Sequence, residues 1–103
     1  MTRTTIPKRL KEARHESGLS QKELGIKAGI DEFAASARMN QYETGKHAPD
    51  FQTLKHIAAV LKIDPSYFYC SDDNLARIIR AYSRANRKGK REIASAIKLF
   101  DAD

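Results

Sequence analysis

Apolar residues along this chain recur mostly at intervals of three and four positions, a spacing that places side chains on one face of a helix. The pattern predicts helices over residues 7–17, 21–28, 37–44 and 51–61, and a short helix after Asp64-Pro65. Two more amphipathic helices are expected, one beginning at residues 71–73 and one over residues 92–100. Lys88-Gly89-Lys90 lies before the last helix at a turn or a weak helix start, with Asn86 as a possible cap. The expected fold is therefore all-α, with five helices in residues 1–70 and two additional helices in residues 71–103.

Capping signals support the predicted helix boundaries. Ser20 and Glu23 have the spacing of a capping box, in which hydroxyl and carboxylate each accept a backbone amide of the first turn. Asp50 and Asp64 are expected to cap the helices that follow them. Gly25 lies inside a predicted helix, where it costs roughly 1 kcal/mol relative to alanine. We therefore expect another helix to approach closely at Gly25.

The predicted helix over residues 37–44 has two different faces. Met39 and Tyr42 form an apolar face, whereas the opposite face carries Ala37, Asn40, Gln41 and Thr44. Asparagine and glutamine can make paired hydrogen bonds to adenine in the major groove. This face therefore favours the reading of DNA bases.

A series of residues around this helix resembles a known family. It comprises Gly18-Leu19-Ser20-Gln21, Glu23-Leu24, Lys27-Ala28-Gly29, Tyr42-Glu43-Thr44-Gly45-Lys46, Pro49, Leu54, Ile57-Ala58 and Leu61. Taken in this order, residues 18–61 resemble the lambda-repressor-like helix-turn-helix regulators, also called the Xre or Cro/C1 family. No single piece is specific, and the resemblance rests on the series.

The resemblance implies a DNA-binding domain in residues 1–70 and assigns roles within it. In that family the helix that follows the turn enters the major groove, which implies base contacts from Ala37, Arg38, Asn40 and Gln41. Phosphate contacts are implied for Gln21, Ser36, Thr44 and Lys46. The family also implies an ion pair between Arg14 and Glu43.

Residues 30–35 depart from the family pattern, because they hold about one extra turn before the predicted recognition helix. We expect Asp31 to cap a separate short turn and Ser36 to act as a new N-cap. Phe33 would then fold back onto the core rather than face DNA.

Composition indicates the class of partner and the cellular compartment. The formal charge of +6 over 103 residues is weak evidence for a polyanionic partner such as nucleic acid. Cys70 is the only cysteine, so no internal disulfide can form and a reducing cytoplasm is the expected location. Met1–Pro7 lacks the apolar core of a signal peptide, and the longest apolar run, Ile57–Leu61, is too short to span a membrane.

The C-terminal extension, residues 71–103, is expected to form a homodimer contact. Its apolar positions are Leu75, Ile78, Ile79, Tyr82, Ile93, Ile97 and Phe100. The alternative is that both helices only cap the monomer core. The basic residues between Arg77 and Arg91, like Lys8, Arg9 and Lys11 in the first helix, are interpreted as solvated.

No pattern in the sequence indicates catalysis. The chain has no glycine-rich phosphate loop and no paired cysteines, and His15, His47 and His56 are scattered. We therefore expect no enzyme activity, no metal and no cofactor.

Two functions remain from different classes. The first is a sequence-specific regulator, a repressor that binds an inverted repeat in double-stranded DNA as a homodimer. The second is a protein-interaction module, such as an antitoxin or adaptor, that retains the helix-turn-helix as a scaffold for a toxin or another regulator.

Overall fold

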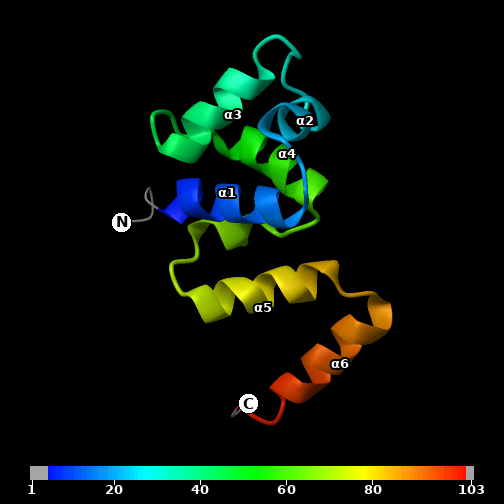
Figure 1. Ribbon diagram of the computed structural model, residues 1–103. Helices are drawn as coiled ribbons and strands as arrows, with labels where there is room; N and C mark the ends of the chain where they lie inside the picture. Colours follow the sequence, from blue (N-terminus) through cyan, green and yellow to red (C-terminus); the bar gives the residue numbers. More distant parts are fainter. Residues whose placement is uncertain (1–4, 102–103) are drawn as a thin grey trace.

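The computed structural model describes residues 5–101, and this part of the chain is all-α, as predicted (Figure 1). The predicted absence of a signal-peptide core rests on Met1–Pro7, of which residues 1–4 lie outside the described part. The elements, in order, are α1 (Thr5–Glu16), α2 (Gln21–Lys27), α3 (Ala35–Thr44), α4 (Phe51–Leu61), the 3-10 helix η2 (Pro65–Tyr69), α5 (Asp73–Arg84) and α6 (Arg87–Ile97).

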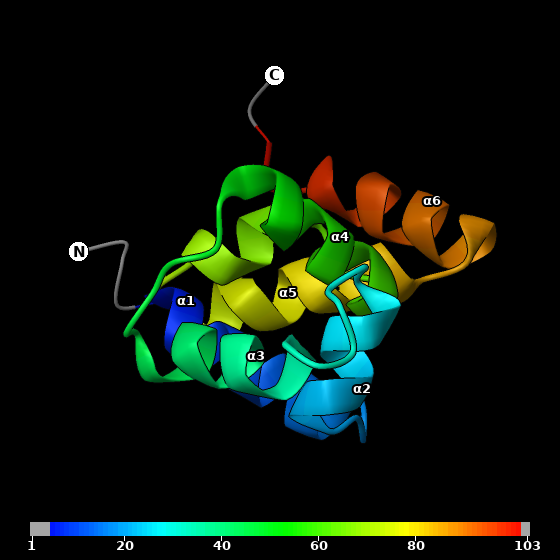
Figure 2. The ribbon, with the colours of Figure 1, turned by 90° about the horizontal axis from the view of Figure 1, so that it is seen from above.

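The core lies where α1 to α4 and η2 meet. Its fully buried large apolar side chains are Leu10, Leu24, Met39, Leu54, Ile57, Tyr67 and Phe68. In Figures 1 and 2, α3 and α2 lie on one side of α1, and α5 crosses on its other side. The core thus supports α3 from behind and leaves its other face in solvent.

Local capping chemistry sets several helix starts as predicted. The Ser20 hydroxyl accepts from the Glu23 amide at 3.0 Å, and the Glu23 carboxylate accepts from the Ser20 amide at 2.8 Å. This bond from the Ser20 backbone lowers the pKa of Glu23. Asp50 and Asp64 cap α4 and η2. Each cap satisfies an amide that has no partner within its helix.

The close approach predicted at Gly25 is present between α2 and α3. A Cβ at residue 25 would lie 2.8 Å from Ala35 Cβ and 3.1 Å from Met39 Cγ. The absence of a side chain therefore allows the two helices of the turn to touch.

The predicted start of α3 is wrong. The helix begins at Ala35, its N-cap is Ala34 without a side-chain cap bond, and Ser36 is an exposed residue of the first turn. Asp31 does hold a short turn, because its carboxylate accepts from the Phe33 amide at 3.0 Å. That turn runs directly into α3, since Ala34 already has right-handed helical geometry.

The expectations for two phenylalanines are also wrong. Phe33 does not fold onto the core but is 91% exposed, because the turn before α3 directs it outward. The helical spacing of Phe51 with Leu54 and Ala58 predicts that Phe51 belongs to the buried stripe of α4. Instead, Phe51 is 57% exposed at the first position of that helix.

The last helix begins earlier than predicted. α6 spans Arg87–Ile97 rather than residues 92–100, because the Asn86 side chain accepts from the Gly89 amide at 2.7 Å. Phe100 lies beyond the helix and is 86% exposed. The spacing of Ile93, Ile97 and Phe100 predicts an inward position for Phe100 in the last helix, and that prediction is wrong within this chain.

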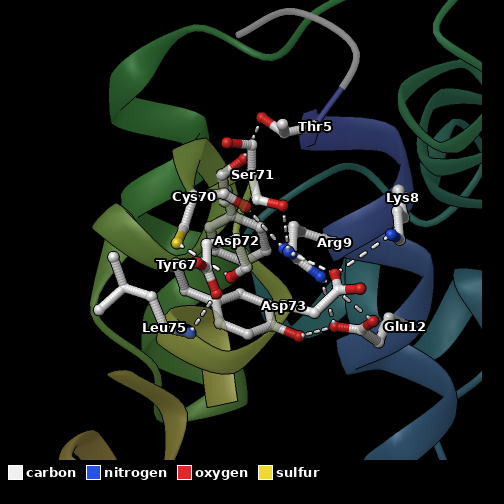
Figure 3. Close-up of polar contacts among 11 residues, drawn as sticks. Thr5, Lys8, Arg9, Glu12, Tyr67, Cys70, Ser71, Asp72, Asp73 and Leu75 are labelled. Carbon is white, nitrogen blue, oxygen red and sulfur yellow. Dashed lines mark hydrogen bonds and ion pairs between the residues drawn. The ribbon is translucent and has the colours of Figure 1, made fainter. Parts of the chain in front are cut away.

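Arg9 joins α1 to the segment that leads into α5 (Figure 3). Arg9 is 2% exposed, so its interpretation as solvated is wrong, whereas Lys8 and Lys11 are exposed. Its Nε donates to the Cys70 carbonyl at 2.8 Å, and its Nη2 donates to the Asp73 carboxylate at 2.9 Å. Arg9 is buried because its guanidinium satisfies backbone and carboxylate acceptors at the joint between η2 and α5.

The neighbours of Arg9 complete this junction. Tyr67 lies with its ring centroid 5.8 Å from the Arg9 guanidinium carbon and donates a hydrogen bond to Glu12. Burial raises the pKa of Tyr67 to about 12, and the bond to Glu12 acts in the same direction. Hydrogen bonds from Arg9 and Lys8 lower the pKa of Asp73. At neutral pH the Tyr67 hydroxyl therefore stays protonated and the Asp73 carboxyl stays ionised.

α5 packs on the core, whereas α6 extends from it. Ala76 is buried in the core cluster, and the Arg84 guanidinium donates to the Leu61 carbonyl at 3.0 Å and to Glu16 at 2.6 Å. No residue of α6 is buried. The radius of gyration, 14.9 Å, exceeds the roughly 13 Å of a compact chain of this length, consistent with the projecting α6 in Figure 1.

Replacing Gly25 with alanine tests the contact between α2 and α3. We expect Gly25→Ala to lower the free energy of unfolding by about 1–2 kcal/mol, because overpacking outweighs the better helix propensity of alanine. Urea unfolding measures this. In an Ala35→Gly background the loss should shrink or become a gain, and an equal loss in both backgrounds would contradict the contact.

Candidate nucleic-acid interface

The exposed face of α3 is polar or small along its length. Ala37, Arg38 and Asn40 are exposed and Gln41 is partly buried, while Ala35, Met39, Tyr42 and Glu43 point into the protein. The four predicted base-reading residues therefore lie on one helix, three of them in solvent.

Arg14 and Glu43 lie in contact behind this face. Arg14 Nε donates to Glu43 Oε2 at 2.5 Å, and Arg14 Nη2 donates to Oε1 at 3.0 Å. Arg14 Nη1 also donates to the Leu19 carbonyl at 2.9 Å. The side chain of Glu43 is 3% exposed. This two-point contact fixes both the position and the rotation of α3 relative to α1.

Gln21 connects the start of α2 to α3. Its Nε2 donates to Glu43 Oε1 and to Asn40 Oδ1, each at 3.2 Å. The second bond holds the Asn40 amide with its oxygen toward α2. Sequence reasoning missed the bond between Gln21 and Asn40, because these residues are 19 positions apart and no pattern in the sequence pairs them.

The other residues predicted to contact phosphate surround the same face. Ser36 is exposed in the first turn of α3, and the Thr44 hydroxyl donates to the Gln41 carbonyl at 3.3 Å in the last turn. Lys46 is exposed just after Gly45, whose φ of +82° ends the helix. These side chains therefore lie at opposite ends of the base-reading residues.

The charge on this surface is positive. Between residues 35 and 49 the only carboxylate is Glu43, and Arg14 neutralises it. Arg38 and Lys46 remain exposed in the same stretch. Net positive charge beside hydrogen-bonding side chains suits a polyanion whose bases present donors and acceptors.

A second surface lies on α5 and α6 and is apolar. Leu75, Ile78, Tyr82, Ile97 and Phe100 are exposed, and Ile79 and Ile93 are partly buried. Ile78, Ile79, Tyr82, Ile93 and Ile97 line an open groove of about 390 Å³ between the two helices. α5 thus covers the core through Ala76 and Ile79 and still presents an apolar face outward. We call these seven residues the α5–α6 face.

Neither a metal cluster nor a membrane-crossing helix is found in the described part. Over residues 5–101 no group of three histidine, cysteine or acidic side chains could hold a metal ion. In the same range every helix is too short or too polar to cross a bilayer.

Comparison with known proteins shows a relative over most of the chain. The crystal structure of transcriptional regulator BswR matches it with a TM-score of 0.82 and 44% sequence identity, covering 91% of this chain and 93% of that chain. The chain belongs to the family of BswR. A match over 91% exceeds what residues 1–70 could supply, so the likeness to BswR includes part of α5 and α6. No protein-family profile and no curated protein sequence matches the chain.

Removing the charge of Glu43 tests what holds α3 in place. We expect Glu43→Gln to lower the free energy of unfolding by about 3 kcal/mol, because Arg14 would lose the carboxylate that compensates its charge. Chemical denaturation provides the measurement. In an Arg14→Met background the same change should cost less than half as much, whereas an unchanged cost would show that the pair is not coupled.

Proposed function

We propose that this protein is a sequence-specific DNA-binding transcriptional regulator of the lambda-repressor-like, or Xre, type. The observation that carries the proposal is the outward face of α3, where amide, guanidinium and small side chains lie together with no exposed carboxylate. Membership in the family of BswR, a transcriptional regulator, supports it. The polar surface also has a rigid support, since Arg14 and Gln21 hold α3 through Glu43.

In the proposed complex, α3 enters the major groove. Arg38 can pair with guanine, Asn40 and Gln41 can pair with adenine, and Ala37 permits close approach of the helix. The bond from Gln21 leaves the Asn40 nitrogen directed away from α2, ready to donate. Gln21, Ser36, Thr44 and Lys46 would contact phosphates on either side, which fix position without reading sequence.

We further propose that the protein is a homodimer, with residues 1–70 as the DNA-binding domain and residues 71–103 as the dimerisation extension. The exposed α5–α6 face supports this, because apolar side chains gathered on one surface favour burial against a partner. Two α3 helices related by a dimer axis would meet successive major grooves about 34 Å apart, which requires an inverted-repeat operator. Occupation of such an operator would repress by blocking polymerase.

One observation also supports a second function. The same α5–α6 face could receive a different protein, such as a toxin or another regulator, and the chain would then act as an antitoxin or adaptor. The mass of the isolated protein in solution distinguishes the two functions, since only the homodimeric regulator requires self-association.

Gln41→Ala tests base reading by α3. Selection of bound duplexes from a random pool should first yield an inverted repeat. On that repeat we expect the variant to bind about 5- to 150-fold more weakly, while binding to scrambled DNA survives, because a good bidentate contact contributes about 1–3 kcal/mol. Gln52→Ala, an exposed glutamine of α4 that contacts His56, is the matched control. Equal losses on both DNAs would contradict the assignment.

Ile78→Asp tests the homodimer. Ile78 is 58% exposed on the proposed face, and we expect light scattering to show a dimer for the parent protein and a monomer for the variant, because the carboxylate would be buried without a partner. Phe51→Asp, at 57% exposure on α4, should leave the dimer intact. A monomeric parent that is well folded would favour the protein-interaction function instead.

A further inference from the structure

Phe33 is the most exposed large apolar side chain among residues 5–101, at 91%. It lies in the short turn between α2 and α3, and not on the α5–α6 face. The turn, like α3, lies at the end of the molecule away from α5 and α6 in Figure 1. A dimer formed through the α5–α6 face would therefore leave Phe33 exposed.

The turn that carries Phe33 is held at several points. The Asp31 carboxylate accepts from the Phe33 amide at 3.0 Å, and the Asp31 carbonyl accepts from the Ala34 amide at 2.9 Å. Just before the turn, the Ile30 amide donates to the Gly25 carbonyl at 2.9 Å. The ring is thus presented from a fixed backbone.

Phe33 lies next to the first turn of α3. Ala34 has helical geometry, and its carbonyl accepts from the Arg38 amide at 2.9 Å. Phe33 directly precedes Ala34, the N-cap, and is adjacent in the chain to the first turn of α3, where Ser36 and Ala37 are exposed. The phenyl ring therefore lies beside the start of the proposed base-reading helix.

We propose that Phe33 contacts the 5-methyl group of a thymine in the major groove, beside the bases that α3 reads. The proposal rests on the proposed DNA-binding function. The thymine methyl is the apolar group that base pairs display in that groove, and a phenyl ring has no polar atom for any other base edge or for phosphate. Asp31 and Glu32 precede Phe33 and oppose a phosphate contact at this turn. The turn therefore adds discrimination and little non-specific affinity.

The test replaces thymine by deoxyuridine, which lacks only the methyl group. Each thymine of the selected repeat is replaced in turn, and binding is measured for the parent protein and for Phe33→Ala. We expect one thymine in each half-site at which the parent loses about fourfold in affinity, the contribution of roughly one buried methyl group. Phe33→Ala should bind the unmodified repeat more weakly and should be insensitive to that replacement.

A matched control separates this contact from a general loss of surface apolarity. Phe51→Ala removes a phenyl ring that is 57% exposed on α4 and should retain the full deoxyuridine effect. Phe33→Leu should retain part of it, because an aliphatic side chain can still cover a methyl group. Binding of all variants to scrambled DNA should be unchanged.

The possible outcomes are distinct. Selective binding to a repeat with no effect of deoxyuridine, or with an effect that persists in Phe33→Ala, overturns the role of Phe33 and leaves the proposed function standing. In that case the ring is available to a protein partner. Absence of any sequence-selective binding by the parent protein overturns the proposed function and this contact with it.

Discussion

The buried carboxylate of Glu43 ties together the three helices on which the candidate interface depends. It accepts from Arg14 on α1 and from Gln21 on α2, and it belongs to α3. A buried carboxylate without such partners would carry a large desolvation cost, so the geometry of this triad is strongly determined. α3 consequently has one position and one rotation on the core. A helix that discriminates bases by hydrogen bonds requires that constraint, because small rotations would move every side chain on its outer face.

Arg9 plays the corresponding role at the other end of the domain. It meets the carbonyl groups of Cys70 and Ser71 where the chain leaves η2, and its bond to Asp73 fixes the first turn of α5. The direction of α5 therefore depends on α1, as does the placement of α3. A single helix thus positions both α3 and α5, so α5 cannot move relative to α3 without breaking the hydrogen bonds of Arg9.

The local features of the fold could be predicted from the sequence, because their causes are local. Helix periodicity and the caps at Ser20, Asp50 and Asp64 depend on residues within a few positions of one another, and the structure shows them. The contact of Arg14 with Glu43 followed only from the family resemblance, since no pattern along the chain joins positions 29 apart. Arg9 had a usable signal: it lies between Ile6 and Leu10 on the buried stripe of α1, where a charge needs partners.

The errors occurred where two local signals competed. Ser36 and Asp31 are both acceptable caps, and the turn held by Asp31 continued into the helix, which left Ser36 without a capping role and Phe33 outside. At the last helix, Gly89 suggested a break in the pattern, but the Asn86 cap satisfied its amide and started α6 earlier. In each case a side chain-to-backbone hydrogen bond decided a boundary that the apolar pattern alone left open.

The structure of α6 bears on how association and folding are related. α6 has 11 residues, none of them buried, and isolated helices of this length are marginal in water. Its contacts within the chain include the Asn86 cap and the approach of Lys90 to the Tyr82 ring, with the nitrogen 5.5 Å from the ring centroid. Neither of these two contacts buries the side chain of Ile97. If the α5–α6 face associates as proposed, a partner would supply the burial that α6 lacks, and its helical structure would depend on protein concentration. The core cluster lies almost entirely in residues 6–70 and would not share that dependence, so dilution should separate loss of α6 from loss of the fold.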